Sequence, residues 1–309
     1  MKNKGAEYIW FDGNFIEWDK ALIPINTHAL HYGTSIFEGI RAYKSNSNLH
    51  IFKLKEHMER LFRSASIYSI KINHTVDELV DGTVQLLRKV NMRESCYIRP
   101  LSFVGVHGID LNVNYGSPTH TFIIVFPFAR YFNAEGIRVG VSSWRRIHDS
   151  STPPIAKAGG NYLNSILATQ ECKRNGYDEA IMLDKNGNVS EAPGENIFVI
   201  KNKTIFTPDM SSSILEGITR DAVISLAEDL GYTIIQRPIS RSELYIAEEI
   251  FLTGTAAEII GVISVDGRNV QNGKEGNITK KIRDTYNDIV TCNHTNTNEK
   301  YKGWTTEVW

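Results

Sequence analysis

The sequence contains few cysteines, no excess of charge of either sign and no long hydrophobic run. Its three cysteines, Cys96, Cys172 and Cys292, are odd in number and widely separated, and no Cys-x-x-Cys pair occurs. Neither a disulfide framework nor a cysteine metal site is therefore predicted. Free thiols are typical of a reducing compartment, so we expect a cytoplasmic protein.

Charge and hydropathy argue against two classes of partner. Thirty-four Lys and Arg face thirty-five Asp and Glu, a formal net charge of -1, whereas nucleic-acid-binding proteins carry a basic surplus. The longest apolar stretch, Phe122 to Ala129, is interrupted by Pro127 and is far shorter than the ~20 residues of a membrane-spanning helix. We expect neither a nucleic-acid nor a membrane partner.

The length and the mixed periodicity predict two domains that combine helices and strands. At roughly 100 to 200 residues per domain, the 309 residues suffice for two hydrophobic cores. The predicted division is a small α/β domain over residues 1–128, an interdomain loop over 129–136 and a larger domain over 137–309. The fold class is therefore α+β or α/β.

Local patterns place the main elements. The Asp12-Gly13 pair lies between two alternating apolar segments and predicts a hairpin, because glycine accepts positive φ. Apolar residues at helical spacing predict helices in both halves, and the last one precedes a polar tail. The predicted helices cover Leu54 to Ala65, Val76 to Val90, Asn161 to Asn175, Thr219 to Leu230 and Ile278 to Ile289.

Lys157 is the first candidate for chemistry. It lies among small apolar residues and glycines in the segment from Pro153 to Asn161. Such neighbours can desolvate a lysine and favour its neutral amine, which attacks aldehydes to form a Schiff base. An ordinary solvated loop lysine is the alternative reading, and this segment alone does not decide between them.

Two segments could bind an anion. Thr219 could cap the helix that follows it, leaving backbone N–H groups directed at a phosphate. The Gly254-Thr255-Ala256-Ala257 turn could offer further N–H groups and a hydroxyl. Plain capping and turn chemistry is the simpler explanation of each segment when it is taken alone.

Charged side chains supply the remaining candidates. Glu191 lies in an irregular run between strands, where a carboxylate beside a ring nitrogen could keep that nitrogen protonated. Tyr97 and Arg99 share one face of a strand because side chains alternate, and Arg41 lies on another predicted strand. The arginines could clamp carboxylates, or they could form surface ion pairs.

His28 and His31 raise the question of a metal site. The two histidines are three residues apart with Glu38 near them, but the run of residues 32–35 is not a helical two-histidine frame and no third histidine or cysteine lies at useful spacing. We expect packed or turn-bonded histidines and no metal.

Seven segments occur together, in an order that resembles the branched-chain amino-acid aminotransferases, the class IV, fold-type IV enzymes that use pyridoxal 5'-phosphate. The resemblance extends over nearly the whole chain. It implies a small α/β N-terminal domain, a larger pseudo-barrel C-terminal domain, and a homodimer or a higher homo-oligomer built from dimers, with the 106–112 loop reaching toward a neighbouring subunit. The segments cover residues 28–35, 37–41, 97–100, 157–162, 190–196, 217–220 and 254–258.

The resemblance also implies roles for individual residues. Lys157 corresponds to the catalytic lysine, Glu191 to the acid that pairs with the pyridine nitrogen, and Tyr162 to the phenol beside O3'. The implied cofactor-binding residues are Arg60, Lys157, Tyr162, Glu191, Gly217, Ile218, Thr219 and Thr255. The implied substrate-binding residues are Tyr32, Phe37, Gly39, Arg41, Tyr97, Arg99, Phe128, Thr255 and Ala256, of which Arg41 and Arg99 accept the second carboxylate of an acidic substrate.

The implied reaction moves an amino group between L-leucine, L-isoleucine or L-valine and 2-oxoglutarate, so the expected partners are small amino acids and 2-oxo acids. A D-amino-acid or amine transaminase and an aminodeoxychorismate lyase share the fold and remain alternatives. A non-catalytic phosphate-ligand-binding protein is the alternative from another class. Phe128, Glu216 and residues 192–194 depart from the common pattern of the family, which bears on the shape of the substrate pocket.

Overall fold

The computed structural model describes residues 6–45, 48–128, 131–132, 136–292 and 299–309. The chain divides into two compact units, and each is described here by itself. Unit 1 comprises Met1–Ala129, Ala156–Gly160 and Asp288–Trp309; unit 2 comprises Arg130–Ile155 and Asn161–Asn287.

The two units differ from the predicted domain ranges in two short segments. Ala158 forms a β-bridge with Ile36, and Thr305–Glu307 pairs with Leu49–Phe52. Both segments therefore belong to unit 1, although the sequence-based ranges place them after residue 136. The predicted interdomain loop falls partly on residues 129–130 and 133–135, which lie outside the described residues.

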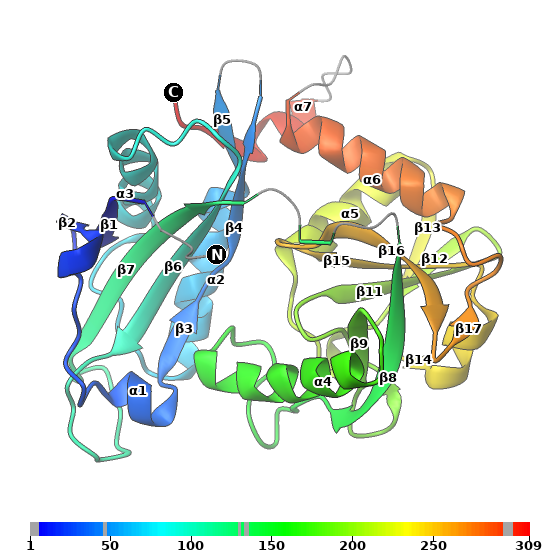
Figure 1. The fold of residues 1–309 in the computed structure, drawn as a ribbon, viewed down its shortest axis with the longest axis horizontal. Helices are drawn as coiled ribbons and strands as arrows, with labels where there is room; N and C mark the ends of the chain where they lie inside the picture. Colours follow the sequence, from blue (N-terminus) through cyan, green and yellow to red (C-terminus); the bar gives the residue numbers. More distant parts are fainter. Residues whose placement is uncertain (1–5, 46–47, 129–130, 133–135, 293–298) are drawn as a thin grey trace. The chain divides into compact units, whose positions relative to one another are not determined.

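Unit 1 is built on an antiparallel sheet with helices α2 and α3 packed beside each other against it (Figure 1). Among the described residues the strands run in the order β18-β5-β4-β6-β7-β1-β2, and β3 pairs with β6. The strands are β1 Tyr8–Phe11, β2 Asn14–Glu17, β3 Ser35–Phe37, β4 Ile40–Lys44, β5 Leu49–Phe52, β6 Cys96–Val104, β7 Thr119–Pro127 and β18 Thr305–Glu307. The helices are α1 His28–Tyr32, α2 Leu54–Ile67, α3 Val76–Lys89, α7 Glu299–Lys302 and the 3-10 turn η1 Trp18–Lys20.

Local chemistry explains the elements of unit 1 that the sequence predicts. The hairpin turns at Asp12 and Gly13, whose φ angles are 45° and 85°, the mirror-image geometry that twisted hairpins prefer. Helix α3 begins with a capping box in which Thr75 and Glu78 satisfy each other's backbone N–H groups. Leu61 and Leu86 of the two helices are fully buried in the core of the unit.

Unit 2 is a mixed sheet that curls around its own apolar core (Figure 1). Its described strands run in the order β13-β12-β11-β15-β16-β8-β9-β10-β14, and β17 pairs with β16. The strands are β8 Ile137–Arg145, β9 Glu179–Leu183, β10 Asn188–Val189, β11 Asn196–Lys201, β12 Thr204–Thr207, β13 Thr233–Gln236, β14 Ile239–Ser240, β15 Glu249–Gly254, β16 Glu258–Val265 and β17 Arg268–Asn269. The helices are α4 Tyr162–Arg174 and α5 Ile218–Asp229, with α6 Asn277–Val290 continuing into unit 1; the 3-10 turns are η3 Met210–Ser212 and η4 Arg241–Ile246, and η2 Gly159–Asn161 begins in unit 1.

The predicted polar tail falls partly on residues 293–298, which lie outside the described residues, but residues 299–309 are structured. The last residues form a short helix and then strand β18, whose neighbours Trp304 and Val308 are buried. Their backbones are anchored in unit 1, since Lys53 donates to the Trp304 carbonyl and Val308 donates to Leu49. Only isolated apolar residues mark this strand in the sequence, which gives no helical or alternating period to detect.

No helix among the described residues has both the length and the apolar character needed to cross a membrane.

Candidate active site

Lys157 lies in a short segment held against β3 of unit 1. Its carbonyl accepts a hydrogen bond from the Phe37 N–H at 3.0 Å, and its own N–H donates to Ser64 Oγ at 3.0 Å. Its Nζ lies 5.0 Å from the centre of the Phe37 ring. The backbone is therefore fixed on two sides, and the amine lies over an aromatic face.

Two arginines share an aromatic surface on strands β4 and β6. Arg41 lies opposite Tyr97 in the strand register, and Arg99 Nη2 donates to the Tyr97 hydroxyl at 3.0 Å, which confirms the predicted common face of Tyr97 and Arg99. The Arg41 guanidinium lies 4.8 Å from the centre of the Phe128 ring, and that of Arg99 lies 4.6 Å from the Phe37 ring. Positive charge and apolar surface thus occur side by side.

Gly39 makes this arrangement possible. A Cβ at position 39 would lie 1.9 Å from the Tyr97 hydroxyl oxygen, far inside any permitted contact. Glycine at this position, just before β4, leaves room for the Tyr97 ring, whose hydroxyl accepts a hydrogen bond from Arg99. The absence of a side chain at position 39 provides the space that Tyr97 occupies.

Arg60, the predicted phosphate ligand, forms a buried ion pair in unit 1. Its Nε and Nη2 each donate to the Glu38 carboxylate at 2.7 Å, and His57 Nδ1 lies 2.7 Å from the same carboxylate. Burial alone would raise the pKa of Glu38, but the charge of Arg60 and the two partners' hydrogen bonds outweigh it and hold that pKa well below the usual range. Burial lowers the pKa of His57, and its Nδ1 donates the hydrogen bond to the carboxylate.

Tyr32, predicted to line the substrate pocket, is the last residue of the short helix α1. Its ring packs on His28 and its hydroxyl donates to the Ile109 carbonyl. His28 is buried and bonds to Thr34, and His31 bonds to the Ile25 carbonyl. Both histidines are therefore turn-bonded or packed, as predicted. No cluster of three metal-ligating side chains occurs in the part of the chain that the structure describes.

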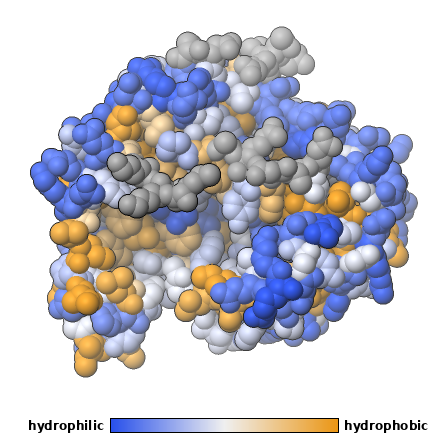
Figure 2. Space-filling view, in the orientation of Figure 1, coloured by the Kyte–Doolittle hydropathy of each residue, from blue (hydrophilic) through white to orange (hydrophobic). Residues whose placement is uncertain are grey.

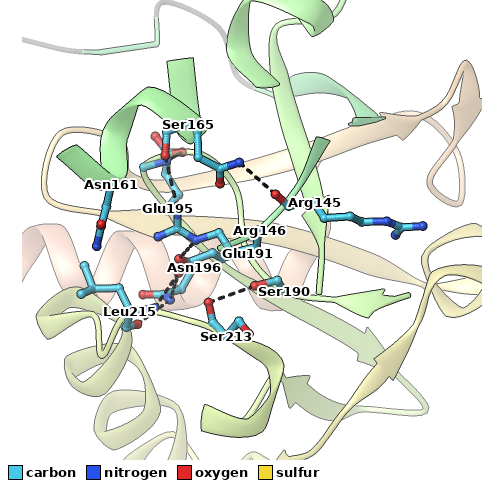
Figure 3. Close-up of polar contacts among 12 residues, drawn as sticks. Arg145, Arg146, Asn161, Ser165, Ser190, Glu191, Glu195, Asn196, Ser213 and Leu215 are labelled. Atoms are coloured by element: carbon cyan, nitrogen blue, oxygen red, sulfur yellow. Dashed lines mark hydrogen bonds and ion pairs between the residues drawn. The ribbon is translucent and has the colours of Figure 1, made fainter. Parts of the chain in front are cut away.

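Glu191 is the central residue of a group of buried polar side chains in unit 2. Figure 3 shows three segments converging on its buried carboxylate. Arg146 Nε donates to Oε1 at 2.8 Å, while Asn196 Nδ2 and the Leu215 N–H donate to Oε2 at 3.0 and 3.1 Å. A carboxylate surrounded by a guanidinium and two further donors is stabilised as the anion.

The start of helix α5 lies directly after this group. The predicted N-cap, Thr219, is wrong: Gly217 is the N-cap, and Ile218 and Thr219 occupy the first turn. Because glycine has no side chain to cap that turn, its N–H groups suit an external anion. The turn of Thr255 and Ala256 connects β15 to β16 in the same unit.

Unit 2 therefore holds two features that fit pyridoxal 5'-phosphate, an anionic acceptor for the ring N–H and a helix start for the phosphate. Tyr162, the predicted neighbour of O3', is the first residue of α4. Sequence reasoning gave no role to Arg146, Glu38 or Asn196. Asn196 lies inside the recognised motif and could have been found there, whereas Arg146 follows a strand end with no pattern to mark it.

Comparison with known proteins agrees with the geometry. The model of the family described as amino-transferase class IV matches residues 35–265. The branched-chain-amino-acid aminotransferase of Escherichia coli K12 is 45% identical over 312 residues, covering 100% of this chain and 99% of that protein.

Two solved structures are similar as well. The branched-chain aminotransferase of Thermoproteus uzoniensis with norvaline is 44% identical, has a TM-score of 0.94, and is matched over 99% of this chain and 100% of that one. A branched-chain amino acid aminotransferase from T.th., complexed with N-(5'-phosphopyridoxyl)-L-glutamate, is 39% identical, with a TM-score of 0.93 and coverage of 98% and 99%.

The chain belongs to the class IV aminotransferase family. The enzymes of this family are pyridoxal-phosphate-dependent, so the predicted enzyme class and cofactor are confirmed. The resemblance to the branched-chain amino-acid aminotransferases and the fold class predicted from it are confirmed by the same comparisons.

The buried Glu38 carboxylate generates a prediction about stability. Glu38→Gln should lower the free energy of unfolding at neutral pH by about 3–5 kcal/mol, because it leaves Arg60 buried without its counter-charge. Since folding lowers the pKa of Glu38 from an ordinary value of 4.5, its stabilising effect is complete above that pH and is lost as the pH falls. The variant should lose less stability on acidification. Urea unfolding across a pH series measures both effects.

Glu56→Gln is the matched control, because Glu56 lies on α2 in a partly exposed ion pair with Lys53. Its effect should stay within about 1 kcal/mol. Equal stability of Glu38→Gln and the wild type would contradict the assigned role.

Proposed function

We propose that the protein transfers the amino group between L-leucine, L-isoleucine or L-valine and 2-oxoglutarate. The observation that carries this proposal is the surface on which Arg41 and Arg99 lie against Phe37, Tyr97 and Phe128. A transaminase with these substrates must accept an apolar and an acidic side chain in turn. Aromatic rings favour binding of the apolar side chain, and two guanidinium groups favour binding of the carboxylate of the acidic side chain.

The relatives support this choice of substrates. The Thermoproteus uzoniensis enzyme was solved with the apolar amino acid norvaline, and the T.th. enzyme with a phosphopyridoxyl derivative of glutamate. Both are branched-chain aminotransferases, and they hold an apolar and an acidic ligand, respectively.

The proposed roles of individual residues are those that the family resemblance implies, and the contacts described within each unit support them. Pyridoxal 5'-phosphate supplies an aldehyde for attachment and a ring that accepts electron density from the substrate. Lys157 provides the amine for attachment and, once released, the base that moves the proton from substrate Cα to cofactor C4'. Glu191 keeps the ring nitrogen protonated, and Tyr162 donates toward O3'.

Anchoring falls to other residues. Arg60, oriented by Glu38, and the backbone N–H groups of Ile218 and Thr219 would hold the phosphate. Gly217 has no side chain to block the phosphate from these N–H groups, and the Thr255 hydroxyl would donate to the same phosphate. The turn of Thr255 and Ala256, together with Tyr97, would bind the substrate α-carboxylate.

We propose that the active form is a homodimer or a higher oligomer built from dimers. Large apolar side chains are exposed on α1 and on the loops beside it in unit 1, and Figure 2 shows apolar residues gathered at the lower left, where Figure 1 places this end. Such a patch is typical of an interaction surface. The patch consists of Leu22, Ile25, Leu30, Tyr32, Val106, Ile109, Leu111 and Tyr115.

We also propose a cytoplasmic location, supported by the exposed free thiol of Cys292, which persists most readily in a reducing compartment.

Lys157 provides the direct test of the chemistry. The purified protein should show a visible cofactor absorbance band, and borohydride should fix the cofactor to the peptide that contains Lys157. Lys157→Ala should abolish the band and reduce the rate by roughly a thousandfold or more, since it removes both the attachment point and the proton-transfer group. Absorbance spectra and peptide mass spectrometry measure these outcomes.

Lys55→Ala, at an exposed position on α2, should keep the band and the rate. A colourless wild type would favour the non-catalytic phosphate-ligand reading, and labelling at another lysine would refute the assignment of Lys157.

The arginine pair tests the substrates. Arg41→Ala combined with Arg99→Ala should raise KM for 2-oxoglutarate by roughly a hundredfold or more, because each of the two lost charged hydrogen bonds contributes about 1.5–3 kcal/mol. The branched 2-oxo acids should be affected much less. Steady-state kinetics with both acceptor types gives the ratio, and equal losses would rule out a pocket that serves both. A donor panel with L- and D-amino acids separates the proposed reaction from the alternatives in the same fold.

The exposed patch tests the assembly. Ile109→Lys should convert the dimer to a monomer, because it places a charge on a surface that the partner would desolvate. Ile246→Lys, at an exposed position in unit 2, is the control and should leave the molar mass unchanged. Light scattering reports the mass; a monomeric wild type, or a dimeric Ile109→Lys variant, would refute the proposed interface.

A further inference from the structure

Asn196 connects the acid of unit 2 to the segment that leads into helix α5. It is the buried first residue of β11. Its Nδ2 donates to Glu191 Oε2 and also to the Leu215 carbonyl, at 3.0 Å in each case. The Leu215 N–H donates to the same Glu191 oxygen. Three hydrogen bonds therefore close a small ring that joins Glu191, Asn196 and Leu215 (Figure 3).

Gly217 gives a second, independent sign of this connection. A Cβ at position 217 would lie 1.9 Å from Asn196 Oδ1. The φ of Gly217 is -73°, which any residue can adopt, so the backbone itself does not require glycine. Glycine is needed because the Asn196 amide lies directly against the N-cap of α5. Asn196 thus touches the helix start through one atom and orients Glu191 through another.

The cofactor gives this connection a function. The pyridine ring and the phosphate of pyridoxal 5'-phosphate are joined by a short linkage, so the groups that bind its two ends must keep a fixed separation. Glu191 would bind the ring nitrogen, and the first turn of α5 would bind the phosphate. Small displacements of either group would weaken the charge-assisted bond at the nitrogen.

We propose that Asn196 is a positioning residue that fixes Glu191 relative to the N-terminus of α5 and thereby keeps the ring nitrogen of the bound cofactor protonated. This inference rests on the proposed function, in which Glu191 and α5 bind the same cofactor. Asn196 acts through Glu191. Gly217 is required because it leaves space for the Asn196 amide.

The protonation state of the ring nitrogen provides the readout. The holoenzyme, loaded with cofactor labelled with 15N in the ring, is followed by NMR across a pH series. The wild type should keep the chemical shift of a protonated nitrogen through the neutral range. Asn196→Ala should move the shift toward the unprotonated position and weaken cofactor binding by roughly tenfold or more, since a hydrogen bond to a charged group is lost.

Gly217→Ala should act in the same direction although Asn196 is still present, because the new methyl group displaces its amide. Asn196→Ser keeps one donor and should give an intermediate shift, which preserves the test if the alanine variant does not fold. Asn175→Ala and Gly303→Ala are the controls. Both positions are exposed, and a Cβ at position 303 would meet no atom within 4 Å.

A double-variant comparison separates positioning from a general structural role. In a Glu191→Gln background, Asn196→Ala should change the 15N shift very little, because the residue through which it acts is already altered. A purely structural role predicts a lower melting temperature with a wild-type 15N shift in the single variants, and that result would overturn the inference.

The test also distinguishes this inference from the proposed function. If the wild type holds no cofactor at Lys157, the proposed function fails and the inference fails with it. If the wild type carries a protonated ring and the Asn196 and Gly217 variants match it in shift and affinity, only the inference is refuted.

Discussion

Taking a carboxylate out of water costs several kcal/mol unless charge and hydrogen bonds replace the lost solvent. Glu38 in unit 1 and Glu191 in unit 2 are both buried carboxylates, and both are stabilised in the same way. One arginine supplies the counter-charge, and other donors fix the orientation of the carboxylate. The proposed cofactor-binding roles depend on these two clusters. The first fixes the orientation of Arg60, and the second fixes the orientation of Glu191.

Strand register brings the remaining groups together. Arg41 and Tyr97 meet because β4 and β6 pair at those positions, and Arg99 follows on the same face. Lys157 is far away in the sequence, but a backbone hydrogen bond from Phe37 ties it to β3, which pairs with β6. Side chains in these places are held by backbone pairing, which gives a more precise geometry than a loop would provide.

Much of this could be predicted from the sequence, for identifiable reasons. Helices with a strong apolar period, such as α3, and the hairpin at Asp12-Gly13 carry local signals that tertiary contacts reinforce. Strand β18 has no such signal, since it exists only through pairing with β5. Arg146 was missed because its partner, Glu191, lies 45 residues further along the chain, and no local pattern records a contact of that range.

Gly39 and Gly217 show a second limit of sequence reasoning. Gly39 lies beside the two arginines of unit 1, and Gly217 lies at the start of α5. A glycine in a motif is commonly read as a turn or as a place where a phosphate approaches the backbone. Neither Gly39 nor Gly217 has a positive φ, and at each position a Cβ would collide with a side chain, Tyr97 or Asn196. The requirement for glycine therefore comes from the neighbouring side chain. If Tyr97 or Asn196 were replaced by a smaller residue, the matching glycine would no longer be required. The motif therefore records pairs of residues that are distant in sequence, and the structure is needed to identify the second member of each pair.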